Sequence, residues 1–172
     1  QAQCCNKSCL KNIPKKDDMK PLRFQDGNWR LRHGVMRYMC LPGQLELKIQ
    51  KIAEKCGCGA ELWPDRDKYD VKITLPDGQV WAIDAKTHRN PYMLKKSIEK
   101  DYVFTHTKAQ KVFYVVPDDC LTDYPDYCKI CNDALASSFP DSIAKCVSMR
   151  IFSKELKGEV EDVKLRNYQK KS

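Results

Sequence analysis

The chain has 172 residues, which suits one domain with a small appendage and argues against two full-sized domains. Hydrophobic residues make up 42% and charged residues 31%, so the chain can build a core and is not expected to be disordered throughout. No apolar run approaches the length of a membrane-spanning helix, and no secretion signal is visible. We therefore expect no membrane partner and a cytoplasmic location, or a nuclear one in a eukaryote.

Basic residues outnumber acidic ones, 31 Lys and Arg against 23 Asp and Glu, which gives a net charge of +8. A surplus of this size favours polyanionic partners such as nucleic acid, although a solvated basic surface explains it equally well.

The N-terminal part, residues 1–28, is polar, contains cysteines and lacks a sustained period. It predicts a Cys-containing segment, a partial zinc knuckle, ahead of a main domain over residues 29–172. An extended segment is expected at 29–41. Pro42 and Gly43 then introduce a helix over 44–55 that the Cys–Gly run at 56–59 ends, because glycine tolerates a left-handed conformation.

The region after this helix predicts three strands. A short strand is expected over 60–63, and two strictly alternating runs, 69–75 and 79–86, flank Pro-Asp-Gly at 76–78 and indicate a β-hairpin. Alternation places apolar side chains on one face, which we expect to be core, and the polar side chains on the other.

The turn type decides which residues of the hairpin face each other. If it is a three-residue loop closed by Gly78 in the left-handed region, Leu75 faces Gln79 and Asp70 stands opposite Asp84. Lys86 then points to the same side as Asp84. A two-residue loop would shift the register by one and misalign the acids.

The second half of the chain predicts a helix over 92–105, a buried strand over 111–116, a short helix over 128–138 and a last strand over 146–152. The order helix, strand, strand, strand, helix, strand is typical of a mixed α/β fold built around one sheet.

Two ionised carboxylates directly opposite each other repel unless a cation lies between them. Mg²⁺ prefers oxygen ligands and typically uses one or two carboxylates plus a phosphate, so Asp70 and Asp84 predict a metal site with Lys86 beside it. The alternative is that both acids are solvated edge charges paired with Lys72, Lys86 or Lys68.

The Asp before the hairpin followed by Asp84-Ala85-Lys86 resembles the PD-(D/E)XK nuclease superfamily, and the element order over residues 43–116 resembles its restriction-endonuclease-like core. This resemblance implies that Asp70, Asp84 and Ala85 hold Mg²⁺ or Mn²⁺, that Lys86 assists the attacking water, and that a first-helix glutamate, here Glu46, lies near the metal. Pro64-Asp65 is a competing match for the first acid.

Further segments, Leu41-Pro-Gly43, Leu45-Glu-Leu47, Glu61-Leu-Trp-Pro-Asp65 and Tyr69-Asp70, are similar to the restriction-endonuclease-like proteins encoded beside PIWI-related proteins in prokaryotic defence islands. The resemblance implies a Mg²⁺-dependent nuclease acting on DNA, with RNA not excluded, and protein partners in a multi-subunit system. The alternatives are a non-catalytic nucleic-acid-binding or assembly module of the same fold and a cysteine-stapled secreted protein.

Basic side chains near the predicted site are candidates for contacts with phosphates, which give affinity without reading sequence. His88 is also a candidate proton shuttle, although a loop histidine is commonly only solvated. The candidates are Lys72, His88, Arg89, Lys95, Lys96 and Lys108.

Ten cysteines predict either a disulfide framework or thiolate ligands of a metal. Without a visible export signal we favour a structural zinc, with Cys128 and Cys131 as the best pair and Cys5 and Cys9 completing it. An iron-sulfur cluster and disulfides remain open, and Cys146 is expected to be a small core residue.

Overall fold

The computed structural model describes residues 43–64, 68–105 and 107–169. The predicted N-terminal segment 1–28 and extended segment 29–41 lie outside the described residues, as do Cys5 and Cys9. The elements are α3 (Gly43–Lys55), β1 (Gly59–Leu62), β2 (Val71–Thr74), β3 (Val80–Ala85), α5 (Pro91–Lys100), β4 (Lys111–Val116), α6 (Cys120–Asp123), α7 (Tyr127–Ser138), β5 (Ala144–Ser148) and α8 (Met149–Gln169).

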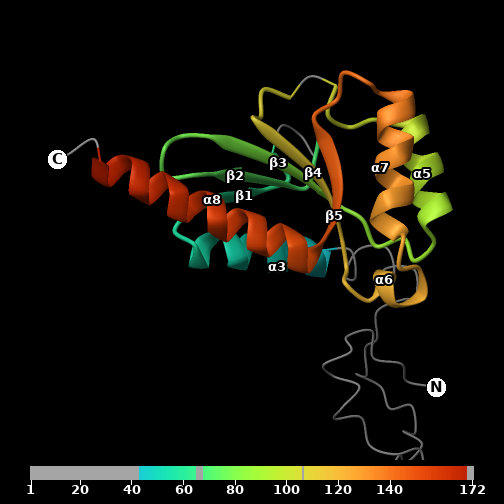
Figure 1. Ribbon diagram of the computed structural model, residues 1–172, viewed down its shortest axis with the longest axis horizontal. Helices are drawn as coiled ribbons and strands as arrows, with labels where there is room; N and C mark the ends of the chain where they lie inside the picture. Colours follow the sequence, from blue (N-terminus) through green and yellow to red (C-terminus); the bar gives the residue numbers. More distant parts are fainter. Residues whose placement is uncertain (1–42, 65–67, 106, 170–172) are drawn as a thin grey trace, which may run out of the picture. The chain divides into compact units, whose positions relative to one another are not determined.

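The strands form one five-stranded sheet in the order β1-β2-β3-β4-β5 (Figure 1). The first three strands pair antiparallel, whereas β3, β4 and β5 pair parallel. Parallel neighbours need a crossover, and α5 and the α6–α7 segment supply the two crossovers. The predicted mixed α/β fold with a helix, three strands, a helix and a strand is therefore confirmed.

The hairpin between β2 and β3 has the predicted three-residue turn. The backbone N–H of Leu75 donates to the Gln79 carbonyl at 2.9 Å, and the N–H of Gly78 donates to the Leu75 carbonyl at 2.9 Å. Gly78 has φ +88°, which a residue with a Cβ rarely adopts. Val71 consequently faces Ile83, which is the register that sequence alternation predicts.

Helix α3 begins at Gly43 and buries one face through Leu45, Ile49 and Ala53. It ends in a Schellman motif, because Cys58 N–H donates to the Ala53 carbonyl at 3.0 Å and Gly57, at φ +83°, donates to the Glu54 carbonyl at 2.9 Å. The predicted glycine stop is thus confirmed, and it turns the chain directly into β1.

Apolar side chains cover both faces of the sheet, so the expectation of a single core face is wrong. Trp81 and Ile83 belong to the core under α3 and α8, which lie together on one side of the sheet in Figure 1. Ala82, in the opposite orientation, is fully buried in a second core with residues of α5, α6 and α7. The second core formed because the α5 and α6–α7 crossovers both lie on this side.

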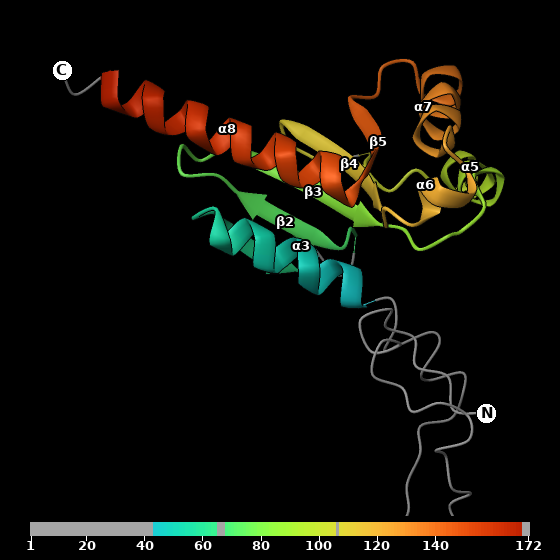
Figure 2. The ribbon, with the colours of Figure 1, turned by 60° about the horizontal axis from the view of Figure 1, so that its bottom comes forward.

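The helical layer over the second face is incomplete. Figure 2 shows α5 and α7 gathered beside β5 and away from β2. On this side no described helix covers β1 or β2, and their outward side chains are half-buried or exposed. The sheet is therefore buried on both faces at β3 and β4, and open on one face at β1 and β2.

Two predicted ends are wrong. Helix α5 ends at Lys100 and not at 105, because Tyr102 stacks on Phe139 with ring centroids 4.5 Å apart and Phe104 turns into the second core. The last strand ends at Ser148, where α8 begins without a loop. The apolar run to Phe152 that indicated a strand is the first turn of this 21-residue helix, whose buried stripe is Phe152, Leu156, Val160 and Val163.

The outer edge of β5 is closed by a side chain of α7. The Asn132 amide accepts a hydrogen bond from Cys146 N–H at 2.7 Å and donates to the Cys146 carbonyl at 3.0 Å. An edge strand otherwise exposes such groups to other chains.

No helix among the described residues is long and apolar enough to cross a bilayer.

The turn glycine predicts a stability difference. Gly78→Ala should lower the free energy of unfolding by about 1 kcal/mol, because φ +88° is strained for alanine. Gly158→Ala, inside α8 with open space around the added methyl group, should raise it by about 0.5–1 kcal/mol. Urea unfolding of both variants checks the pair, and equal effects of the same sign would contradict the assigned turn.

Candidate active site

The hairpin brings the two predicted acids together. The backbone N–H of Asp70, just before β2, donates to the Ile83 carbonyl of β3 at 3.1 Å, although the strand pairing itself ends at Val71 opposite Ile83. Asp70 Oδ2 accepts a hydrogen bond from Ala85 N–H at 2.7 Å, so its carboxylate is fixed against the end of β3 beside Asp84. The juxtaposition that the turn type predicts is present.

Lys86 turns back toward this pair of acids. Its Nζ lies 2.7 Å from Asp84 Oδ2, and the two side chains are 23% and 5% exposed. The Lys86 backbone N–H donates to the Val115 carbonyl at 2.8 Å, so the sheet itself fixes the start of the side chain. The Lys86 ammonium group is thus held beside the buried Asp84 carboxylate.

Glu46 lies in the first turn of α3 and is 5% exposed, which places a fourth ionisable side chain in this environment. Burial raises the pKa of Glu46 to about 7, the Asp70 carboxylate adds to the rise, and the Lys86 ammonium opposes it. Among the described residues Glu46 Oε2 has no hydrogen-bond partner. Glu46 is therefore not an ordinary exposed helix glutamate.

The electrostatics of Asp84 follow the same pattern. Burial raises the pKa of Asp84 above its ordinary value, Lys86 opposes the rise, and Asp70 adds to it. A site that holds three carboxyl groups and one ammonium group in a nearly dry environment favours either bound protons or an added cation.

The donor set suits a small hard cation that retains water. Among the described residues no three Asp, Glu, His or Cys side chains converge closely enough to enclose a metal ion. Mg²⁺ does not need such a cage, because one or two carboxylates and several waters suffice. The resemblance assigns this role to Asp70, Asp84 and the carbonyl of Ala85, and the unpartnered Glu46 Oε2 suits a water or a cation that the chain does not itself provide.

The competing alignment through Pro64-Asp65 stays open, since Asp65 lies outside the described residues. Asp84 pairs with Lys86, as the alternative of edge charges states, but it is not solvated, since its side chain is 5% exposed. Lys72, one of the partners in that alternative, instead pairs with Glu61 at 3.4 Å.

Two of the predicted basic contacts lie near each other. Lys72 of β2 and Lys108, which precedes β4, both line one pocket on the face opened by the incomplete helical layer. Lys95 and Lys96 are instead on α5, where Lys95 pairs with Glu99 at 3.8 Å and Lys96 is exposed. The structure therefore groups the first two and leaves the second two on a separate helix.

The loop after β3 holds the remaining two predicted contacts. Arg89 makes ion pairs with Asp119 at 3.7 Å and Asp123 at 3.9 Å, so two acids near α6 compete with any phosphate for it. Partial burial and the Lys86 ammonium lower the pKa of His88, so its ring is neutral at pH 7. That state suits proton transfer better than phosphate binding.

Sequence reasoning missed the residues that fix this loop. Tyr127 Oη donates to the His88 carbonyl at 2.6 Å, and Cys120 Sγ donates to the same oxygen at 3.6 Å. It also missed Trp63, whose N–H donates to the Asp70 carbonyl at 2.8 Å and whose φ of +50° is unusual for a bulky residue. The sequence signal for Trp63 was Pro64, which follows the end of the predicted strand. The sequence around Tyr127 gave no comparable signal.

The predicted zinc site depends on Cys5 and Cys9 and so stays a prediction. Cys131 is fully buried, and hydrogen bonding with Cys128 and Cys131 raises the pKa of the Cys146 thiol, which places the three close together. All described cysteines are free thiols. Cys146 is buried in the second core, as predicted.

The buried Glu46 predicts an unusual pH dependence of stability. Its folded pKa of about 7 lies above the ordinary 4.5, so its contribution is fully present below pH 4.5 and is lost as pH rises through 7. Glu46→Gln removes this loss. In EDTA we expect the variant to gain on the order of 2 kcal/mol of unfolding free energy over wild type between pH 5 and pH 8.

Glu54→Gln is the matched control, because Glu54 is exposed on the same helix. Its unfolding free energy, from urea titrations at each pH, should run parallel to that of wild type. A Glu46→Gln curve that also runs parallel would show that Glu46 titrates normally.

The chain matches a protein-family model. The family model described as "REase associating with pPIWI_RE", where REase denotes a restriction endonuclease, matches residues 43–163. No curated protein and no solved structure matches the chain. The matched range contains α3, the whole sheet, the acid pair and most of α8. The chain therefore belongs to the restriction-endonuclease-like family that associates with PIWI-related proteins.

Proposed function

We propose that the protein is a Mg²⁺-dependent nuclease that hydrolyses phosphodiester bonds of DNA. The observation that carries the proposal is the meeting of Asp70 and Asp84 at one end of the hairpin, with the Lys86 ammonium 2.7 Å from Asp84 Oδ2. The opposed acids and the buried glutamate provide oxygen ligands for a cation, and the lysine provides positive charge for a polyanionic substrate. The family membership supports a nuclease of the restriction-endonuclease type.

Asp70, Asp84 and the Ala85 carbonyl would hold Mg²⁺, or Mn²⁺ in its place. When bound, the metal supplies positive charge that polarises the phosphate and makes water more acidic. The chain's own groups divide the other tasks. Lys86 stabilises negative charge that develops on the phosphate oxygens, and it needs no reorganisation because Asp84 and the sheet already orient it.

Glu46 is the group best suited to take a proton. A carboxyl with a pKa of about 7 exchanges protons at neutral pH, whereas an ordinary glutamate at 4.5 is too weak a base. Its Oε2 has no partner among the described residues and is therefore available to a water. His88, neutral and exposed beyond Lys86, is the second candidate for passing a proton to solvent.

The biological setting is part of the proposal. Since the family is described as associating with pPIWI_RE, we propose that the protein works with a PIWI-related partner in a prokaryotic defence or mobile-element system in the cytoplasm. A partner that delivers nucleic acid would explain a catalytic centre with few basic contacts of its own. Zinc in the cysteine-containing N-terminal segment remains an additional proposal.

Cleavage of supercoiled DNA tests the activity. Wild type should nick or linearise plasmid in Mg²⁺ or Mn²⁺ and not in EDTA, and Asp84→Asn and Lys86→Gln should each be slower by at least a hundredfold. Lys129→Gln, an exposed charge on α7, is the control and should cut like wild type. A parallel reaction with single-stranded RNA separates the two substrates.

Metal-independent cutting, or Lys86→Gln at the wild-type rate, would refute the assigned roles. A protein that binds DNA but cuts neither DNA nor RNA in either metal would instead be a non-catalytic module of this fold.

Proton release on metal binding tests the site without an activity assay. Because the pKa values of Glu46 and Asp84 are raised, both groups carry protons near pH 6.5 that a cation should displace. Titration with Mg²⁺ in a weakly buffered solution should therefore release protons from wild type and fewer from Asp84→Asn. Equal release from both would place the metal elsewhere.

A further inference from the structure

A pocket of about 310 Å³ lies outside the acid site, and it is rich in lysine. Three of its lining side chains are lysines, from the segment before β2, from β2 itself and from the segment before β4. Its described lining residues include no acid. The residues on which the inference depends are Lys68, Tyr69, Lys72, Thr107 and Lys108.

Several residues that line the pocket are sequence neighbours of Asp70 in the acid site. Lys68 and Tyr69 immediately precede Asp70, and Lys72 lies two residues beyond it on β2. Lys72 faces Ala82 across the hairpin, and Ala82 belongs to the core under α5 and α7. The pocket therefore lies on the α5–α7 side of the sheet, where the helical layer leaves β1 and β2 open.

Its charge is mostly uncompensated. Lys72 pairs with Glu61 at 3.4 Å, but both side chains are more than a third exposed, so the pairing is weak. Among the described residues Lys68 and Lys108 have no ion-pair partner, and both are exposed. In contrast, Lys111 is neutralised on the other side of the sheet by Glu155 and Glu159 of α8.

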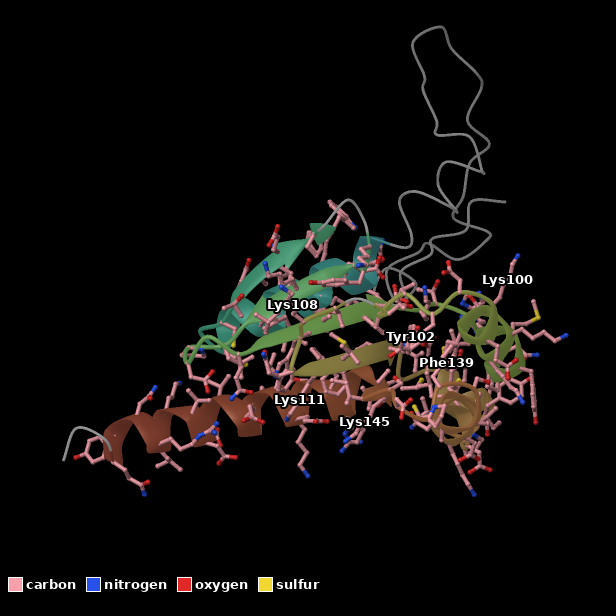
Figure 3. The ribbon with its side chains drawn as sticks, turned by 90° about the horizontal axis from the view of Figure 1, so that it is seen from above. Lys100, Tyr102, Lys108, Lys111, Phe139 and Lys145 are labelled. Carbon is pink, nitrogen blue, oxygen red and sulfur yellow. The ribbon has the colours of Figure 1, made fainter. Side chains whose placement is uncertain are left out.

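One residue that lines the pocket, Tyr69, is packed against the second core. Tyr69 is 5% exposed, and its ring lies 6.3 Å from that of Phe104, which is anchored in the second core. Thr107 also lines the pocket, and Figure 3 shows Lys108 away from α8, toward which Lys111 and Lys145 lie. A packed aromatic side chain with exposed ammonium groups around it is suited to an anion that enters from solvent.

We infer that this lysine pocket binds a backbone phosphate of the nucleic acid, next to the phosphate at the acid site. The inference rests on the proposed function, because it takes the bound strand to be the nuclease substrate. Lysines contact phosphate as point charges, so the pocket contributes affinity and orientation but no sequence preference. The strand then crosses the open face from Lys86 toward β1 and β2.

Salt dependence of binding is the test, measured by fluorescence anisotropy of a labelled DNA duplex in EDTA, where no cleavage interferes. Each lysine–phosphate interaction that a substitution removes should reduce the slope of log K against log salt by about 0.9 for a duplex and about 0.7 for a single strand. Lys68→Gln/Lys108→Gln should therefore lower the slope by roughly 2 and weaken binding at least tenfold at low salt.

Two controls distinguish the effect of the pocket lysines from the effect of the protein's overall positive charge. Lys154→Gln/Lys157→Gln makes the same charge change at exposed positions of α8, across the sheet, and should leave the slope unchanged. Lys68→Arg/Lys108→Arg keeps the charge and should restore the wild-type slope. Urea unfolding of each variant should match wild type, since all four positions are exposed.

The outcomes separate this inference from the proposed function. If wild type cuts DNA in Mg²⁺ but the pocket variant keeps the wild-type slope, or the α8 variant loses as much, the pocket is refuted and the nuclease stands. If the slope falls as expected but wild type cuts nothing in any metal, the nuclease is refuted and a phosphate-binding pocket stands. No binding by wild type at low salt refutes the pocket.

Discussion

The register of one hairpin determines both the core and the site. The turn closed by Gly78 sets Val71 against Ile83, and the same pairing sets Asp70 beside Asp84. A slip of one residue would invert every side chain of one strand, so that Trp81 would leave its core and the acids would part. Because Trp81 is fully buried, the hydrophobic effect that stabilises the sheet also maintains the geometry of the acid pair.

The candidate site is locally destabilising, and the surrounding packing offsets it. Asp84 and Glu46 are almost fully buried carboxyl groups, and removing a charge from water without full compensation costs several kcal/mol. Apolar residues at the same positions would make a more stable protein that lacks these ionisable groups. Raised pKa values at the meeting point of strand and helix ends are typical of sites selected for function, and they distinguish this cluster from surface pairs such as Lys95 with Glu99.

Local signals could be predicted from the sequence. The stops at Gly57 and Gly78 and the alternation of β2 and β3 depend on neighbouring residues, so the helix end, the turn and the facing acids followed from the sequence alone. The position of Lys86 beside Asp84 followed from the same alternation, and their pairing was part of the alternative of edge charges.

Features that depend on distant contacts could not be predicted in the same way. The burial of Glu46 depends on how α3 packs on the sheet, and a glutamate beside an apolar stripe is equally compatible with exposure. The early end of α5 reflects the stacking of Tyr102 on Phe139, a residue far along the chain. The junction of β5 and α8 has no loop, so the apolar residues up to Phe152 imitated a longer strand. The helices that cover Ala82 belong to crossovers, and the alternation of a strand does not reveal on which side of the sheet a crossover runs.

The loop that follows Lys86 has a main-chain tether in addition to the exposed ion pairs of its Arg89 side chain. Tyr127 and Cys120 both donate to the carbonyl oxygen of His88, an atom that every amino acid possesses. Replacement of the residues at 87–89 therefore leaves the tether intact, and the backbone can keep its path while the exposed chemistry at the rim diverges. Side chains at the rim can therefore change without rebuilding the acid site behind them.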